Sequence, residues 1–167
     1  MSTLQVVLVD DNHDDRVILG WHLRKSGIPH TLTELTSCRD ALPFFTAALQ
    51  TTKDSAAKFL VIVDLNLSDG NGLDLLEDLD RLAARQSVDL AQRWVVLVLT
   101  ATIHDDELRR ARRLGFVADM LEKPLTRKRL LRLMAAHYPD VATAFASSLT
   151  PREDTDDSAR GRATDTT

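Results

Sequence analysis

Three short apolar runs constrain the fold of this chain most strongly. They are LQVVLV at 4–9, FLVIV at 59–63 and VVLVL at 95–99, and their apolar residues are largely continuous instead of alternating with polar ones. A strand with one face in water alternates apolar and polar residues, whereas a strand covered on both faces is apolar throughout. The sequence therefore predicts a parallel sheet whose central strands are buried between layers of helices.

Apolar residues at helical spacing follow each of these runs. Two weaker runs, 32–35 and 116–121, supply a strand nearer an edge and a fifth strand. The helical stripes comprise Val17, Ile18, Trp21 and Leu23; Ala41, Leu42, Phe44, Phe45, Ala48 and Leu49; Leu73, Leu76, Leu79 and Leu82; Leu108, Ala111 and Leu114; and Leu125, Leu130, Leu131, Leu133 and Met134. A strand followed by a helix thus occurs five times, which predicts an α/β domain with helices on both faces of a parallel sheet.

Local signals place several helix ends. Gly27 and Gly115 follow the last residues of their stripes and are typical stop signals. Ser37 is a candidate cap for the second helix, but Pro43 lies within its apolar stripe and predicts a later start or a kink. The stretch 50–58 is expected to be an extended loop before the third strand.

Length and composition predict one domain with a tail. The 167 residues suffice for a single domain, which we place at 1–138. Residues 139–149 form a candidate short helical extension that needs an apolar partner. From 150 to 167 the chain is rich in acids and threonine, and it has too few apolar residues to offset the entropy of ordering. That segment is predicted to be a disordered tail.

Charge and cysteine content narrow the function classes. The net charge of -4 argues against general affinity for nucleic acid. Cys38 is the only cysteine, which excludes an internal disulfide and a thiolate metal cluster, and we expect it to be a small buried residue. No apolar stretch approaches the ~20 residues of a membrane helix, and no secretory signal is visible. The expected location is the cytoplasm, with no membrane partner.

Chemically active side chains follow four of the five strands. Asp10 and Asp11 follow the first strand, Asp64 the third, Thr100 the fourth and Lys123 the fifth. Ligands of open parallel sheets bind outside the carboxyl ends of the strands, so these side chains are expected to converge.

Clustered carboxylates raise one another's pKa unless a cation intervenes. Mg²⁺ is the natural cation where phosphate is also bound, and one carboxylate could act as nucleophile to form an aspartyl-phosphate. Asp10 and Asp11 are then candidate metal holders, with Lys123 as a second positive charge, while Lys123 and Thr100 would hold phosphoryl oxygens.

This combination resembles the receiver domain of two-component response regulators over about residues 4–137. The stretches VDDNHDDR at 9–16 and DLNLSDGNGLDLL at 64–76 are close to the patterns of that family. The resemblance implies a flavodoxin-like, doubly wound sheet of five strands with five helices, followed by a short C-terminal extension. It also implies that Asp64 is the phosphoacceptor.

The resemblance further implies a magnesium site. Asp11 and Asp64 match direct ligands of Mg²⁺, Asp10 matches a residue that holds the metal through water, and the backbone carbonyl of Asn66 matches the third protein ligand.

The remaining matches concern the phosphoryl group and the switch. Thr100 and Lys123 match phosphate-binding residues, Ala101 matches a small residue where the phosphodonor approaches, and Pro124 is expected to follow a cis peptide bond. Met120 departs from the family, which often has an aromatic switch residue at that position. A flexible thioether should switch less sharply.

The implied function is that of a stand-alone response regulator. It would accept a phosphoryl group from a histidine kinase and signal through an unidentified downstream protein, as a homodimer. It would not be an enzyme, apart from catalysing its own phosphorylation and autodephosphorylation. The sequence DLNLSDGNG and the expected loop at 50–58 resemble small regulators that partner bacterial phytochromes, so the kinase could be a bacteriophytochrome.

Three alternatives remain open at this point. A haloacid-dehalogenase-like phosphohydrolase uses a similar residue set, but there the nucleophile precedes the acid pair, and Asn66 stands where a second aspartate is expected. A receiver-fold scaffold that works without phosphorylation need not retain the active residues. A flavodoxin-like electron carrier should have a phosphate-binding loop after the first strand, where this chain has acids.

Several other motifs have simpler structural interpretations. His13, Asp14 and Asp15 are expected to start the first helix, where negative charge suits the helix dipole. The stretch DGNG at 69–72 is typical of a turn that begins a helix. Trp21 and Trp94 are expected in the core or at an interface.

Two basic clusters have similarly simple interpretations. The cluster ELRRARR at 107–113 is expected to be a solvated helix face, with Asp105 paired to Arg109 and Asp106 to Arg110. A second cluster, 127–129, begins the last helix and could contribute to a partner or dimer surface.

Overall fold

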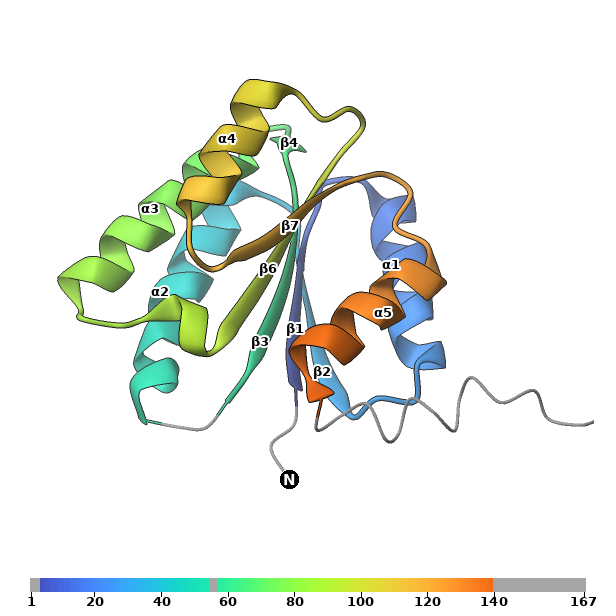
Figure 1. Cartoon of the computed structure of the whole chain (residues 1–167), viewed down its shortest axis with the longest axis horizontal. Helices are drawn as coiled ribbons and strands as arrows, with labels where there is room; N and C mark the ends of the chain where they lie inside the picture. The colour runs from blue at the N-terminus through green and yellow to red at the C-terminus, as the bar shows by residue number, and fades with distance from the viewer. Residues whose placement is uncertain (1–3, 55–56, 140–167) are drawn as a thin grey trace, which may run out of the picture.

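The computed structural model describes residues 4–54 and 57–139, and it shows one parallel sheet between two layers of helices (Figure 1). The sheet strands are β1 (Leu4–Val9), β2 (His30–Leu35), β3 (Phe59–Asp64), β6 (Trp94–Thr100) and β7 (Val117–Glu122). Their order is β2-β1-β3-β6-β7, and every neighbouring pair is parallel. The winding reverses between β1 and β3, so the carboxyl ends of these two strands flank the crevice where such sheets bind ligands.

The helices form two layers. Helices α1 (His13–Lys25) and α5 (Arg127–His137) cover one face of the sheet. The other face is covered by α2 (Cys38–Asp54), α3 (Gly72–Arg85) and α4 (Asp105–Arg113), as Figure 1 shows. The predicted doubly wound sheet of five strands with five helices is confirmed in the described part of the chain.

The two faces of the central strands pack into separate apolar clusters. In β1, Val7 and Val9 belong to the cluster under α2, α3 and α4, whereas Val6 and Leu8 belong to the cluster under α1 and α5. All six residues of β3 are buried. This two-sided burial is the reason that the apolar runs are continuous, because successive side chains of a strand point to opposite faces.

Strand boundaries differ slightly from the prediction. The bounds of β1 are as predicted, but β2 begins at His30, two residues early, because Leu4 and Gln5 of β1 pair with His30 and Thr31. The fourth and fifth predicted strands likewise shift or lengthen by one residue at their ends. Backbone pairing thus extends the strands into residues whose side chains are polar or aromatic.

The structure of helix α2 confirms one prediction and corrects two. Ser37 caps it, since its Oγ accepts the Asp40 amide at 3.1 Å, and Pro43 lies inside the helix instead of delaying its start. The helix also runs on to Asp54, so the predicted loop is wrong for residues 50–54. Thr52 explains part of this extension, because its buried Oγ1 accepts a hydrogen bond of 2.9 Å from the indole nitrogen of Trp94.

The two tryptophans have different environments. Trp94 is buried and stacks on Phe59, as expected of a core residue. Trp21 is 49% exposed on α1, beside the equally exposed Val17 and Ile18. Trp94 therefore takes the core position of the two that were predicted, whereas Trp21 is not in the core, and its place at an interface stays a prediction.

Ion pairs of α4 also differ from the prediction. Arg109 pairs with Asp106, one residue closer than expected. Arg110 reaches α3 instead, where it pairs with Asp74 at 2.5 Å and Glu77 at 2.9 Å. Both carboxylates belong to α3, which packs beside α4. The sequence of α4 alone therefore could not predict these ion pairs.

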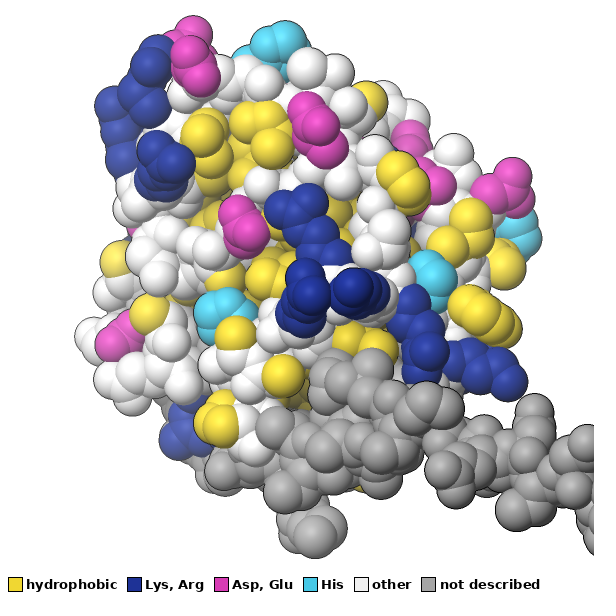
Figure 2. All heavy atoms as spheres, turned by 45° about the vertical axis from the view of Figure 1, so that its right-hand side comes forward, with side chains coloured by type: hydrophobic (Ala, Val, Ile, Leu, Met, Phe, Trp, Pro, Cys, Tyr) yellow, Lys and Arg dark blue, Asp and Glu magenta, His cyan; other side chains and the backbone are white. Residues whose placement is uncertain are grey.

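The basic cluster at 127–129 begins α5. Its first residue, Arg127, is half-buried and donates to the backbone carbonyl of Lys25 at 3.1 Å, whereas Lys128 and Arg129 are exposed. The last turn of α1 is basic as well, so Lys and Arg side chains gather on the face formed by α5 and the end of α1, with hydrophobic side chains beside them (Figure 2).

The described chain ends against the sheet. Tyr138 is buried, and its hydroxyl donates to the backbone carbonyl of Phe59 at 2.7 Å. The predicted extension at 139–149, except Pro139, and the predicted tail at 150–167 lie outside the described residues. None of the described helices is long and apolar enough to cross a membrane.

A two-stranded hairpin between β3 and α3 is absent from the prediction. Strands β4 (Asn66–Leu67) and β5 (Gly70–Asn71) pair antiparallel, and Asn71 then caps α3 by accepting the Leu73 amide. A helix begins at the end of the stretch 69–72 as predicted, but the turn itself lies at 68–69, and residues 70–71 form β5. A short 3-10 helix, η1 (Leu90–Gln92), is a second unpredicted element.

Gly72 closes the hairpin against the end of β3. Its amide donates to the carbonyl of Leu65 at 2.7 Å, and a Cβ at this position would lie 2.4 Å from the backbone oxygen of Asp64. Such a distance is far inside van der Waals contact, so α3 can begin this close to β3 only with glycine at position 72.

We therefore predict that Gly72→Ala destabilises the protein by about 1–3 kcal/mol, the usual cost of overpacking. Urea denaturation would measure the change. Gly115→Ala is the matched control, because no atom lies within 4 Å of a Cβ built at Gly115. Equal stability of the two variants would contradict the steric argument.

Asp69, in the hairpin turn, caps a helix that is remote in sequence. Its two carboxylate oxygens accept the amides of Cys38 and Arg39, at 2.8 and 2.9 Å, at the start of α2. These hydrogen bonds hold the pKa of Asp69 below its ordinary value of 3.8. The hairpin after β3 is thereby tied to the neighbouring helix.

Cys38, at the same junction, packs against the core as expected, but it is only half-buried. Burial and the nearby Asp69 raise the pKa of its thiol to about 11, which keeps the thiol protonated at neutral pH.

The cap predicts a pH-dependent effect of Asp69→Ala. Because folding lowers the pKa of Asp69, its stabilisation is complete above the unfolded pKa and is lost as the pH falls through the folded one. The urea midpoint of the variant should lie below that of the wild type at pH 7, and the difference should shrink below about pH 4. Asp80→Ala, at an exposed position of α3, is the control. A difference independent of pH would contradict the ionic cap.

Candidate functional site

The predicted polar residues meet at one edge of the sheet. Asp10 and Asp11 follow β1, Asp64 ends β3, Thr100 ends β6, and Lys123 follows β7. Because β1 and β3 are neighbours at the switch point of the sheet, their three carboxylates come together. One oxygen from each of Asp10, Asp11 and Asp64 lies within 4.8 Å of the other two.

The ammonium group of Lys123 lies among three carboxylates. Its Nζ is 3.0 Å from Asp10 Oδ2, 2.8 Å from Asp64 Oδ2 and 2.8 Å from Asp15 Oδ2. Burial alone would lower the pKa of Lys123, but these hydrogen bonds together raise it above its ordinary value. The lysine is therefore charged throughout the physiological range.

Asp10 is the most buried of the acids, with 3% of its side chain exposed. Burial raises its pKa, against the opposing effect of Lys123 and of the Asn12 amide, which donates to Oδ1 at 2.8 Å. The backbone of Asp10 is also fixed, since its amide donates to Leu35 and its carbonyl accepts from Arg16 Nη1 at 2.8 Å. Asp10 is thus held in place by its neighbours on both sides.

Asp11 and Asp64 have one oxygen each in a backbone contact. Asp11 is exposed, and its Oδ2 accepts the Ser68 amide of the hairpin at 2.8 Å. Asp64 is 9% exposed, and its Oδ1 accepts the Asn66 amide at 3.0 Å. Both contacts link the acid cluster to the hairpin that follows β3.

The charge balance of the cluster favours a further cation. With Asp15 included, four carboxylates face the single ammonium of Lys123. Oxygen ligands at such close spacing suit a hard divalent ion such as Mg²⁺. The donor set present therefore fits the predicted metal.

Thr100 lies at the same edge, but its hydroxyl donates its hydrogen bond to the backbone and not to the acids. Its buried hydroxyl donates to the carbonyl of Thr102 at 2.9 Å, and its own carbonyl accepts the Lys123 amide at 2.8 Å. The next residue, Ala101, is exposed, and Met120 is buried in β7. The peptide bond between Lys123 and Pro124 is cis.

Asp15 belongs to the site through its contact with Lys123, which the sequence did not lead us to expect. As expected, it lies in the first turn of α1, but the cap is Asn12, whose Oδ1 accepts the amides of Asp14 and Asp15 at 2.9 and 3.1 Å. The carboxylate of Asp15 instead reaches Lys123. The signal was present in the sequence, because Asp15 lies one and two turns before the buried Leu19 and Leu23 and hence on the face that α1 turns to the sheet.

Arg16 was missed as well. Besides its bond to Asp10, it pairs with Glu34 of β2 at 3.2 Å. The sequence could not indicate this pair, because it depends on β2 lying beside β1 at the edge of the sheet.

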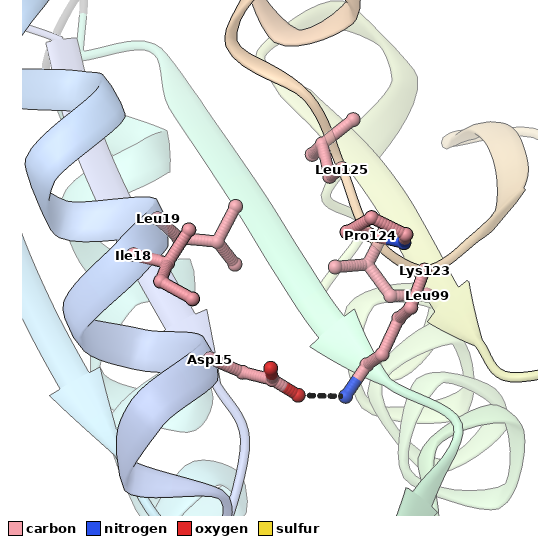
Figure 3. A pocket seen from close by; sticks show the side chains of 7 residues that line it. All are labelled: Asp15, Ile18, Leu19, Leu99, Lys123, Pro124 and Leu125. Atoms are coloured by element: carbon pink, nitrogen blue, oxygen red, sulfur yellow. Dashed lines mark hydrogen bonds and ion pairs between the residues drawn. The ribbon is translucent and has the colours of Figure 1, made fainter.

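A cavity of about 240 Å³ adjoins the acid cluster. Its apolar walls include Ile18 and Leu19 of α1 and, opposite them, Pro124 and Leu125. Asp15 and Lys123 meet across it, as Figure 3 shows. The site thus has an apolar side as well as an acidic one.

Known structures share the fold. The receiver domain of the histidine kinase CKI1 from Arabidopsis thaliana is 18% identical, with 81% of this chain and 91% of that one covered and a TM-score of 0.65. The chemotaxis protein CheY4 of Vibrio cholerae is 17% identical, with 81% and 98% covered and a TM-score of 0.58. The Mn²⁺-bound response regulator Rcp1 is 24% identical, with 80% and 90% covered and a TM-score of 0.57.

Comparison with protein families gives one assignment. A search of curated proteins finds no match. The family described as the response regulator receiver domain matches residues 6–135, which is most of the chain and includes all the acids of the cluster as well as Lys123. The chain therefore belongs to the receiver domain family of two-component response regulators.

Proposed function

We propose that this receiver accepts a phosphoryl group on Asp64 from a histidine kinase, with Mg²⁺, and signals through contacts with another protein. The observation that carries the proposal is the position of the Lys123 ammonium, 2.8 Å from Asp64 and 3.0 Å from Asp10 at the buried end of β1 and β3. Membership of the receiver family supports it, since receivers take phosphoryl groups from histidine kinases.

Asp64 is suited to act as the nucleophile. It is the acid at the end of the central strand β3, and the contacts of Oδ1 with the Asn66 amide and of Oδ2 with Lys123 fix its orientation. One of its oxygens would bond to phosphorus while the bond from phosphorus to the donor imidazole nitrogen breaks. The imidazole leaves with that electron pair, and Lys123 offsets the charge on the phosphoryl oxygens.

Asp10, Asp11 and Asp64 would hold the metal, with the backbone carbonyl of Asn66 as a further ligand. The spacing of the three carboxylates supports this assignment, as does the Mn²⁺ bound to the similar regulator Rcp1. When bound, Mg²⁺ would neutralise charge on the carboxylates and the phosphoryl oxygens. Asp10 is the candidate to act through a water molecule.

Thr100, Ala101 and Met120 are the proposed switch residues. The hydroxyl of Thr100 would exchange its bond to Thr102 for one to the phosphoryl group, and the small Ala101 would leave room for the donor. The buried Met120 would then repack under the surface formed by β6, α4, β7 and α5. Autodephosphorylation would use the same site and water.

The proposed donor is a histidine kinase, and its identity as a bacteriophytochrome stays a prediction. The homodimer and the cytoplasmic location also stay predictions. An acceptor site of this composition favours phosphotransfer over a scaffold that works without phosphorylation. Family membership and the early position of the acid pair speak against a phosphohydrolase of the haloacid dehalogenase type.

The direct test is phosphorylation by acetyl phosphate with Mg²⁺, followed by the intact mass. The wild type should gain the mass of one phosphoryl group, and Asp64→Asn should gain none because the amide is a poor nucleophile. Asp80→Asn is the control, since Asp80 lies on the exposed face of α3.

Phosphoryl uptake by Asp64→Asn would show that another residue is the phosphoacceptor. Turnover of a generic phosphomonoester would instead support the phosphohydrolase alternative.

A further inference from the structure

We propose that Asp15 is a positioning residue that holds the Lys123 ammonium at the phosphorylation site from the side of α1. The inference rests on the proposed function of that site. It concerns a residue outside the acceptor and metal set, on a different element and in direct contact with the lysine.

The contacts of Lys123 give Asp15 a separate role. An ammonium group has three N–H donors, and Lys123 has three carboxylate acceptors, namely Asp10, Asp64 and Asp15. Asp10 and Asp64 belong to the proposed metal site, and a phosphoryl group on Asp64 would replace one of the three acceptors. Asp15 is the acceptor that stays available to Lys123 both when a metal binds and when Asp64 is phosphorylated.

The first turn of α1 is fixed to the site, so Asp15 is held in position to bind the lysine. Asn12 caps the helix, so the Asp15 carboxylate is not needed for capping. Arg16, the next residue, ties the same turn to the carbonyl of Asp10 at 2.8 Å. Leu19, one turn on, is buried against the sheet.

Figure 3 shows the two side chains reaching toward each other from opposite walls of the cavity. The lysine crosses this space on four methylene groups, and an unrestrained chain of that length has many rotamers. The Asp15 contact reduces them before a phosphoryl group arrives. Asp15 thus prepares Lys123 for the phosphoryl group without touching that group itself.

The expected effect is modest, because the Asp15 side chain is 36% exposed and water screens the pair. Asp15→Asn should lower the rate of phosphorylation by acetyl phosphate about two- to fivefold at saturating Mg²⁺. Asp15→Glu, which keeps the charge, should recover at least part of the rate. Asp14→Asn is the matched control, because it removes the same charge from the same turn at an exposed position.

Mg²⁺ affinity separates positioning from structural damage. Positioning predicts that Asp15→Asn lowers the rate while the dissociation constant for Mg²⁺ stays within about twofold of the wild type. If uptake and Mg²⁺ binding weaken together, or if Asp14→Asn slows uptake as much, the proposal is wrong. An unchanged rate in Asp15→Asn would also overturn it.

A double-mutant cycle in urea denaturation tests the pair independently of phosphorylation. The effects of Asp15→Asn and Lys123→Met should be non-additive, whereas those of Asp14→Asn and Lys123→Met should add. If the Asp15 and Lys123 effects on stability are coupled but the protein takes up no phosphoryl group, the contact is supported and the proposed function is refuted. Additivity of the Asp15 and Lys123 effects would refute the contact itself.

Discussion

The ammonium group of Lys123 is the interaction on which the rest of the site depends. It lies within 3.0 Å of carboxylate oxygens of Asp10 after β1, Asp64 in β3 and Asp15 in α1, and it is the cation that allows Asp10 and Asp64 to lie together in a buried position. Buried carboxylates without such a partner are costly. One ammonium does not balance the charge of four carboxylates, however, so the arrangement is suited to a further divalent cation. It also suits an exchange in which Lys123 gives up a carboxylate partner and binds a phosphoryl group on Asp64.

The fold supplies this convergence through a few local constraints. Parallel pairing of β1 with β3, and of β3 with β6, brings the ends of these strands to one edge. The hairpin of β4 and β5 then turns beside that edge, held by the Asp11 contact to Ser68 and by the Asp69 cap of α2. Gly72 lets α3 start against the end of β3. Helix α1 approaches from the other side through Asp15 and Arg16.

Much of this could be predicted from the sequence, and the failures have identifiable causes. The central strands and the acids that follow them are evident because two-sided burial makes the strands apolar up to the first aspartate. Asp15 was missed because a charged residue in the first turn of a helix also satisfies the helix dipole. The partners of Arg110 and Arg16 depend on which elements are neighbours in space, and no local pattern contains that information. The extension of α2 past Gln50 depends on a buried bond between Thr52 and Trp94, residues far apart in sequence.

The central claim is that the acid cluster and Lys123 together form a site for Mg²⁺ and a phosphoryl group. Binding of beryllofluoride, a mimic of the phosphoryl group, tests this most directly, because it requires no kinase and no stable phosphate. Fluorine NMR of the wild-type protein should show a bound signal that appears only when Mg²⁺ is present. A folded protein that shows no bound signal with Mg²⁺ present, or the same signal without it, would contradict the account.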